Sequence, residues 1–182
     1  MLSRRTAPLL LALGLSPLVV CGLPRAADAA SVEGAPLVSL RASAPLTVVL
    51  HAPSDLRGAL RRLPSSVDEG PVVRLSIERV KAPGGTTIRV FVNLPNATAD
   101  TPTSDFHYVG SLTVFEDPAP DSPGDDFLLD AGRAFKRLKR GDRLLLGDNV
   151  SVTLVLEPGT GGADVEIPIE RVVLSVEEAP GR

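Results

Sequence analysis

Cysteine, histidine and aromatic residues are scarce in this sequence, and each shortage weakens the case for a class of chemistry. The single cysteine, Cys21, lies in an N-terminal segment that we expect to be removed, so the remaining chain has no disulfide and no thiol nucleophile. One tyrosine and five phenylalanines leave few rings to stack against a sugar. The GxSxG, P-loop and HExxH motifs are missing, so hydrolase and nucleotide chemistry have no support. The fold must rest on its hydrophobic core, and we predict no catalytic residues.

The two histidines, His51 and His107, are too few to predict a metal centre. Without a cysteine or methionine partner in the exported chain they form a poor copper site. One loop carries four carboxylates but lacks the glycine and terminal glutamate of a calcium-binding loop: Asp117, Asp121, Asp125 and Asp126. We interpret this loop as a hydrated acidic segment, and we predict neither a metal nor a cofactor.

Residues 1–30 have the layout of a secretory signal peptide. Arg4 and Arg5 precede an apolar run over residues 7–20, and small residues at 27–29 form a cleavage site. The run is shorter than the roughly 20 residues that a membrane-spanning helix needs. We therefore expect removal on export, a secreted or periplasmic protein, and no stable membrane span.

Two features of this segment bear on the export route. The arginine pair is followed by Thr6 and Ala7, where a twin-arginine signal prefers an aromatic residue and a leucine, so the general secretory and twin-arginine routes both stay open. Cys21 could carry a lipid, but Val20 stands where a lipoprotein signal has a small residue. We expect the cysteine to be lost with the signal.

Charge gives no reason to expect a nucleic acid or an anionic membrane as partner. Without residues 1–30 the chain has sixteen basic and twenty-one acidic residues, a net charge of −5. Six basic residues nevertheless gather within residues 133–143: Arg133, Lys136, Arg137, Lys139, Arg140 and Arg143. We interpret them as the solvated face of a helix, with an acidic partner as the alternative.

The exported chain divides into a flexible leader at residues 31–44, a β domain at 45–178 and a tail at 179–182. Apolar residues alternate with polar ones in most of the domain, which is the two-residue period of a strand. The expected strands are 46–50, 73–77, 88–92, 107–115, 150–156, 165–169 and 172–176.

Helical signals are fewer. Ala131, Ala134, Phe135 and Leu138 share one face, and Gly141 ends the helix. One or two further helical turns are expected at residues 54–63. With no alternation of strands and helices, the sequence predicts a mainly β fold, an antiparallel β-sandwich or partly open barrel of about six or seven strands with one short helix.

Local details of the strands lead to more specific expectations. Gly110 marks a bulge, with Tyr108 on the same face as Leu112 and Val114. The apolar phase slips by one residue near Glu170, for which a second bulge is the simplest cause. Pro168 places the last strand at a sheet edge or requires it to begin again after a break.

Three segments carry a resemblance to a known family: FVNLP at residues 91–95, DFHYVG at 105–110 and DNVSVTLV at 148–155. With the order of elements around them, they resemble the C-terminal accessory domain of polyphenol oxidases and tyrosinases. The likeness runs over residues 45–177. Plant members carry a Lys-Phe-Asp-Val signature, and here TIRV at residues 87–90 keeps only the final valine.

The resemblance implies a β-rich lid that, in that family, lies over a copper pair held by six histidines in a separate catalytic domain. That catalytic domain is missing here. The resemblance therefore implies a non-enzymatic, exported accessory protein for a tyrosinase-like copper oxidase. The alternative is a free-standing envelope β-sandwich with a binding or structural role.

Four residues are candidate contacts with such a partner: Phe91, Phe106, His107 and Tyr108. Around them we expect a contiguous apolar patch. Two local interpretations stay open. Phe91 could be covered by another layer of the protein, and Tyr108 could pack inward while His107 caps the loop before its strand.

Overall fold

The computed structural model describes residues 30–33, 38–41, 43–64, 71–144, 146–157, 159–160 and 165–177, which form ten strands and two helices. The elements are β1 (Ala30–Glu33), β2 (Val38–Arg41), β3 (Leu46–His51), α1 (Ser54–Arg62), β4 (Val72–Val80), β5 (Thr86–Val92), β6 (Tyr108–Val114), β7 (Asp125–Asp130), α2 (Gly132–Arg140), β8 (Asn149–Leu156), β9 (Glu166–Ile169) and β10 (Arg171–Glu177). The predicted mainly β class is confirmed, with more strands than expected, and the helical turns expected at residues 54–63 form α1.

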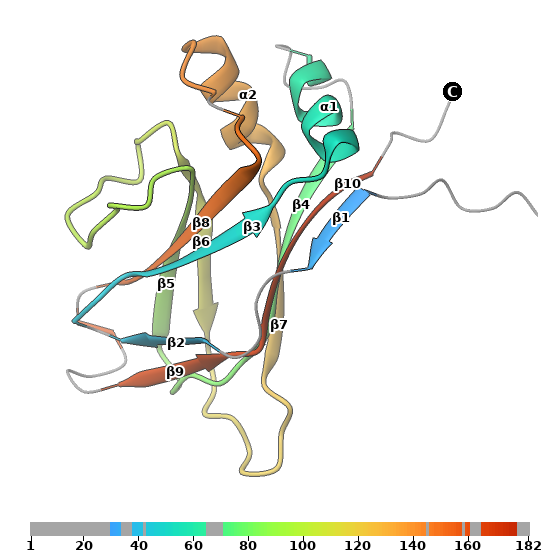
Figure 1. The fold of residues 1–182 in the computed structure, drawn as a ribbon. Helices are drawn as coiled ribbons and strands as arrows, with labels where there is room; N and C mark the ends of the chain where they lie inside the picture. Colours follow the sequence, from blue (N-terminus) through green and yellow to red (C-terminus); the bar gives the residue numbers. More distant parts are fainter. Residues whose placement is uncertain are drawn as a thin grey trace, which may run out of the picture.

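Two four-stranded antiparallel sheets make up most of the fold (Figure 1). One has the order β1-β10-β4-β7 and the other the order β3-β8-β5-β6, while β2 and β9 pair separately. Alternate residues of both sheets point into one shared core, in which Leu75, Ile88, Val152 and Leu174 are fully buried. The arrangement is a β-sandwich, because the inward faces bury the apolar half of each alternating strand.

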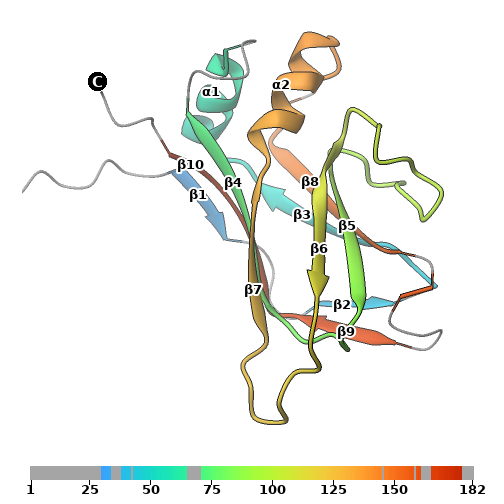
Figure 2. The same cartoon turned by 180° about the vertical axis from the view of Figure 1, so that it is seen from behind.

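The two helices lie side by side at one end of the sandwich (Figures 1 and 2). The apolar face predicted for α2 is buried, and the Asp130 carboxylate accepts a hydrogen bond from the Gly132 amide at 2.9 Å. Lys139 Nζ reaches across from α2 and donates to the carbonyls of Arg61 and Leu63, at 2.6 and 2.7 Å. This ammonium satisfies carbonyls at the C-terminal end of α1 and ties the helices together.

None of the described helices is long and apolar enough to cross a membrane.

Residues 31–44, expected to be a flexible leader, contribute two strands instead. β1 pairs with β10, and β2 pairs with β9. Both strands are short and take their hydrogen-bond partners from the far end of the chain, so local sequence does not reveal them. The predicted signal peptide, apart from Ala30, and the tail at 179–182 lie outside the described residues.

The phase slip near Glu170 is a change of sheet, so the predicted bulge is wrong there. β9 pairs with β2, whereas β10 pairs with β1 and β4. Pro168 lies in the separate two-stranded pair, opposite Ser39. The expectation that the strand begins again after a break is confirmed.

Candidate functional site

A bulge at the start of β6 determines how the candidate residues are arranged. Val90 lies opposite Gly110, but Phe91 lies opposite Tyr108, so Val109 is an extra residue in the ladder. The bulge predicted at Gly110 is confirmed. An extra residue shifts the alternation of side chains between the two faces of the sheet by one position. Tyr108 therefore shares a face with Phe91 and not with Leu112. The predicted grouping of Tyr108 with Leu112 was wrong for that reason.

Phe91 belongs to a small second core on the outer face of its sheet. It is fully buried with Ala97 and Val155, and Tyr108 packs against this group. Residues 93–107 form the loop that covers it, which we call the covering loop. Phe91 was predicted as a partner contact, and its burial excludes that role while the loop is in place.

Arg89 holds the covering loop against the sheet. Its side chain is 16% exposed, and Nη1 donates to the carbonyls of Ala99 and Thr101, at 3.1 and 3.4 Å. Nη2 donates to the Glu157 carboxylate at 2.6 Å. Sequence reasoning missed Arg89 and Glu157, since a charged residue on the polar side of a strand gives no local sign of a tertiary partner.

His107 and Tyr108 are half-buried and engaged in local bonds. The His107 amide donates to Asp105 Oδ1 at 2.8 Å, and its Nδ1 donates to the Val92 carbonyl at 2.8 Å. The Tyr108 hydroxyl lies 2.8 Å from Ser111 Oγ. These contacts support the local interpretation of His107, because both of its bonds close the end of the covering loop. They also fix the direction of the chain at this corner.

Phe106 carries the exposed apolar surface of the corner. Its side chain is 40% exposed, and the guanidinium carbon of Arg143 lies 4.7 Å from its ring centre. Arg137 Nη2 donates to the Tyr108 carbonyl, so α2 is bonded to the same corner. Among the four candidate residues the expected apolar patch reduces to Phe106, and its surroundings are basic.

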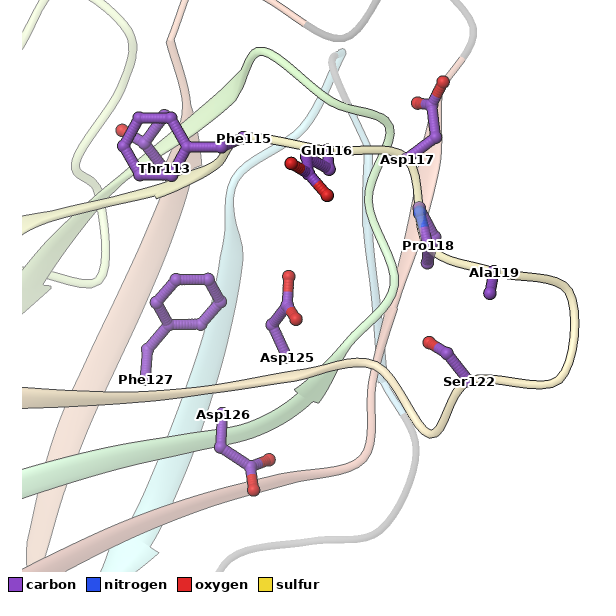
Figure 3. A pocket seen from close by; sticks show the side chains of 10 residues that line it. All are labelled: Thr113, Phe115, Glu116, Asp117, Pro118, Ala119, Ser122, Asp125, Asp126 and Phe127. Carbon is purple, nitrogen blue, oxygen red and sulfur yellow. The ribbon is translucent and has the colours of Figure 1, made fainter.

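A concave feature lies at the end of the sandwich opposite the helices, where residues 115–124 connect β6 to β7. It is a cleft of about 510 Å³ between Phe115 and Phe127, with the carboxylates of Glu116 and Asp125 directed into it (Figure 3). Phe115 is 86% exposed.

Two other carboxylates, one in this loop and one at the start of β7, hold backbone in place. Asp117 Oδ1 accepts from the Gly84 amide and Asp126 Oδ1 from the Arg79 amide, both at 2.8 Å. Within the described ranges, no three His, Cys, Asp or Glu side chains are grouped so that they could hold a metal ion. These amide bonds support reading the loop as an acidic segment with two structural carboxylates.

Comparison with known proteins finds similarity only among solved structures, since no protein-family model and no curated protein matches the chain. Latent aurone synthase (polyphenol oxidase) from natural source superposes with a TM-score of 0.53 and 17% identity, over 78% of this chain and 26% of that chain. The recombinantly expressed enzyme gives 0.53 and 17%, over 79% of this chain and 26% of that chain. The chain is similar in fold to one portion of a polyphenol oxidase. Latent apple tyrosinase, at a TM-score of 0.45 and 16% identity over 79% of this chain and 27% of that chain, is too distant to add weight.

The chain thus spans about a quarter of the length of the polyphenol oxidases it matches. At these identities the likeness is one of fold. Within that fold, the structure brings all four candidate residues to one corner of the sandwich, beside α2. It leaves only Phe106 substantially exposed there.

Proposed function

We propose that this chain is a non-catalytic, exported accessory protein that covers or assists a type 3 copper oxidase of the tyrosinase kind. The supporting observation is the extent of the fold likeness, which takes in most of this chain and only 26% of the polyphenol oxidase chain. The sequence resemblance to the C-terminal accessory domain agrees with it. In this proposal the copper-binding part belongs to another polypeptide.

The side chains of this chain do not fit a copper pair, and no step of copper chemistry is assigned to them. The sequence has two histidines, where the family uses six. His107 directs Nδ1 at the Val92 carbonyl, and His51 lies in β3 opposite Asn149. The role left to the chain is contact with the oxidase.

Contact would be made through the corner that carries Phe106. The ring is exposed, while the residues beside it are held by bonds to Asp105, Val92 and α2. A preorganised aromatic side chain loses little conformational freedom on binding, which favours its use as an anchor. A separate chain lacks the high effective concentration of a tethered domain, so its interface must bury roughly 1,000 Å² or more.

Co-expression with a tyrosinase-like copper oxidase tests the proposal. We expect the two proteins to co-purify and the rate of diphenol oxidation to change when this chain is present. Phe106→Ala should weaken co-purification. Phe115→Ala is the matched control, because it removes an exposed ring at the opposite end. Absence of co-purification together with an unchanged oxidation rate would favour the alternative, a free-standing envelope β-sandwich.

A further inference from the structure

Positive charge is concentrated at the helix-bearing end of the sandwich. α1 contains three basic residues and one acidic residue, and residues 130–143 contain six basic and two acidic residues. These two segments together carry a net charge of +6, although the whole chain has a net charge of −3. The helices lie side by side, so their charges share one end of the molecule (Figures 1 and 2).

Negative charge is concentrated at the other end. The loop between β6 and β7 and the start of β7, residues 116–126, contain five acidic residues and no basic residue. Figures 1 and 2 show this loop projecting from the end of the sandwich away from the helices. The two helical segments and this loop therefore place opposite net charges at opposite ends of the sandwich.

Some cations at the helix-bearing end are used by the fold, and others face solvent. Lys139 and Arg137 donate to backbone carbonyls. Arg62 and Arg143 are exposed, and neither forms an ion pair with a carboxylate of the described residues. An exposed cation can meet a carboxylate of a partner, and its charge speeds the approach of a negatively charged surface.

A cleft between the ends of the two helices lies within this basic end and could receive a side chain of the partner. It has a volume of about 300 Å³ and is lined by Arg61, Lys139, Asp142, Leu144 and Leu146. Two cations against one carboxylate leave the lining positive. Its two leucines could pack against the alkyl stem of an inserted side chain, so the cleft suits a glutamate of a partner.

We propose that this chain docks by its helix-bearing end onto an acidic face of a protein partner. The inference rests on the proposed function, since that partner is taken to be the copper oxidase. Arg62 and Arg143 face the partner's carboxylates, and Phe106 lies among these cations because Arg143 stacks on its ring. The acidic loop at residues 116–126 points away, and its repulsion from the same acidic face sets the orientation.

Charge reversals on the full chain, measured against the purified oxidase, test the docking mode. Arg62→Glu and Arg143→Glu change the basic end, and Lys81→Glu makes the same change in charge at the far end of β4. Association and dissociation rates are measured by surface plasmon resonance at low and high salt. Arg62→Glu leaves the Phe106 ring untouched, so it separates charge from ring packing.

We expect each reversal at the basic end to slow association about tenfold at low salt, with Lys81→Glu within about twofold of the unchanged chain. The difference should shrink at high salt. If the unchanged chain binds the oxidase and all three variants bind equally well, the docking mode is overturned while the proposed function stands. If the unchanged chain does not bind, the proposed function fails and this inference fails with it.

Heparin, a sulfated polysaccharide, serves as the competing probe. The chain could bind heparin as tightly as it binds the oxidase, with both interactions abolished by the same two charge reversals. In that case the basic end is a general polyanion site, and the assignment to an acidic protein face is overturned. Weak heparin binding with tight oxidase binding supports the protein partner.

Discussion

Tyr108 packs against Phe91 with ring centres 5.6 Å apart and ring planes inclined at 59°. The pair closes the small core beneath the covering loop, and it exists because the extra residue Val109 brings Tyr108 to the outer face of the sheet. The four candidate contacts therefore separate into two kinds. Phe91, His107 and Tyr108 hold the covering loop in place, while Phe106, within that loop, presents an exposed ring.

Phe91→Ala should lower the free energy of unfolding by about 3–5 kcal/mol, because it removes a fully buried ring and leaves a cavity. Phe106→Ala should cost less than about 1 kcal/mol, since its ring is partly in water already. Urea denaturation followed by circular dichroism measures both. Equal losses for the two variants would contradict the division of roles.

Arg89→Met should loosen the covering loop selectively. It removes hydrogen bonds to Ala99, Thr101 and Glu157, and charged hydrogen bonds of this kind are each worth roughly 1.5–3 kcal/mol. We expect faster amide hydrogen exchange at residues 97–101 and a loss of stability of at least 2 kcal/mol or so.

Arg74→Met is the matched control for Arg89→Met. Arg74 pairs with Glu177 at 2.9 Å on the exposed face of the other sheet, and such a surface pair contributes little to stability. If amide hydrogen exchange at residues 97–101 were equally fast in the two variants, Arg89 would not stabilise the covering loop more than an ordinary surface ion pair does.

Glu166 should make the pairing of β2 with β9 sensitive to acid. Hydrogen bonds from Arg41 and Ser39, with the positive charge of Arg41, lower the pKa of Glu166 below its ordinary value of 4.5. A lowered folded-state pKa means that the stabilisation is complete above pH 4.5 and is lost as the pH falls through the folded-state value. Carboxyl chemical shifts followed by NMR report this pKa directly.

Arg41→Gln should raise the pKa of Glu166 toward 4.5, because the dominant hydrogen bond and charge are removed. Glu166→Gln should abolish this acid-dependent contribution. An unchanged pKa in Arg41→Gln would show that the guanidinium does not stabilise the carboxylate.

Gly124→Ala should destabilise the fold more than Gly85→Ala. Both glycines have positive φ, +97° and +80°, so alanine is strained at either position. At Gly124 a Cβ would also lie 2.9 Å from the carbonyl group atoms of Arg79 and Val80, whereas at Gly85 the space is open. We expect losses of roughly 3 kcal/mol and roughly 1 kcal/mol respectively, measured by thermal denaturation. Equal losses would rule out the close approach at Gly124.

Much of the fold could be predicted from local pattern, because a strand with one wet face must alternate and a helix must repeat its apolar face. The helix face of Ala134, Phe135 and Leu138 and the alternation of β4 and β8 are such cases. The bulge at Gly110 could be predicted in the same way. The side of the sheet on which Tyr108 lies could not be predicted. It depends on which residue of β6 is left without a partner in β5, and only the strand pairing shows this.

The structure brings the four candidate contacts to one corner, but the sequence could not predict which of them are exposed. A phenylalanine in a strand looks the same whether it is covered or exposed, and the burial of Phe91 follows from the covering loop. The basic residues after Arg133 were visible as a cluster. Their meeting with α1 and Phe106 depends on how two helices pack at one end of the sandwich.

Sequence by itself determined the class of fold, the helix at 132–140 and the shortage of histidine and cysteine. These depend on residue identity and short-range spacing. The tertiary structure alone decided that residues 31–44 supply β1 and β2, that the chain changes sheet at Glu170, and that opposite charges occupy opposite ends. Each of these needs partners far apart in the chain, and short-range periodicity carries no information about which distant segments will meet.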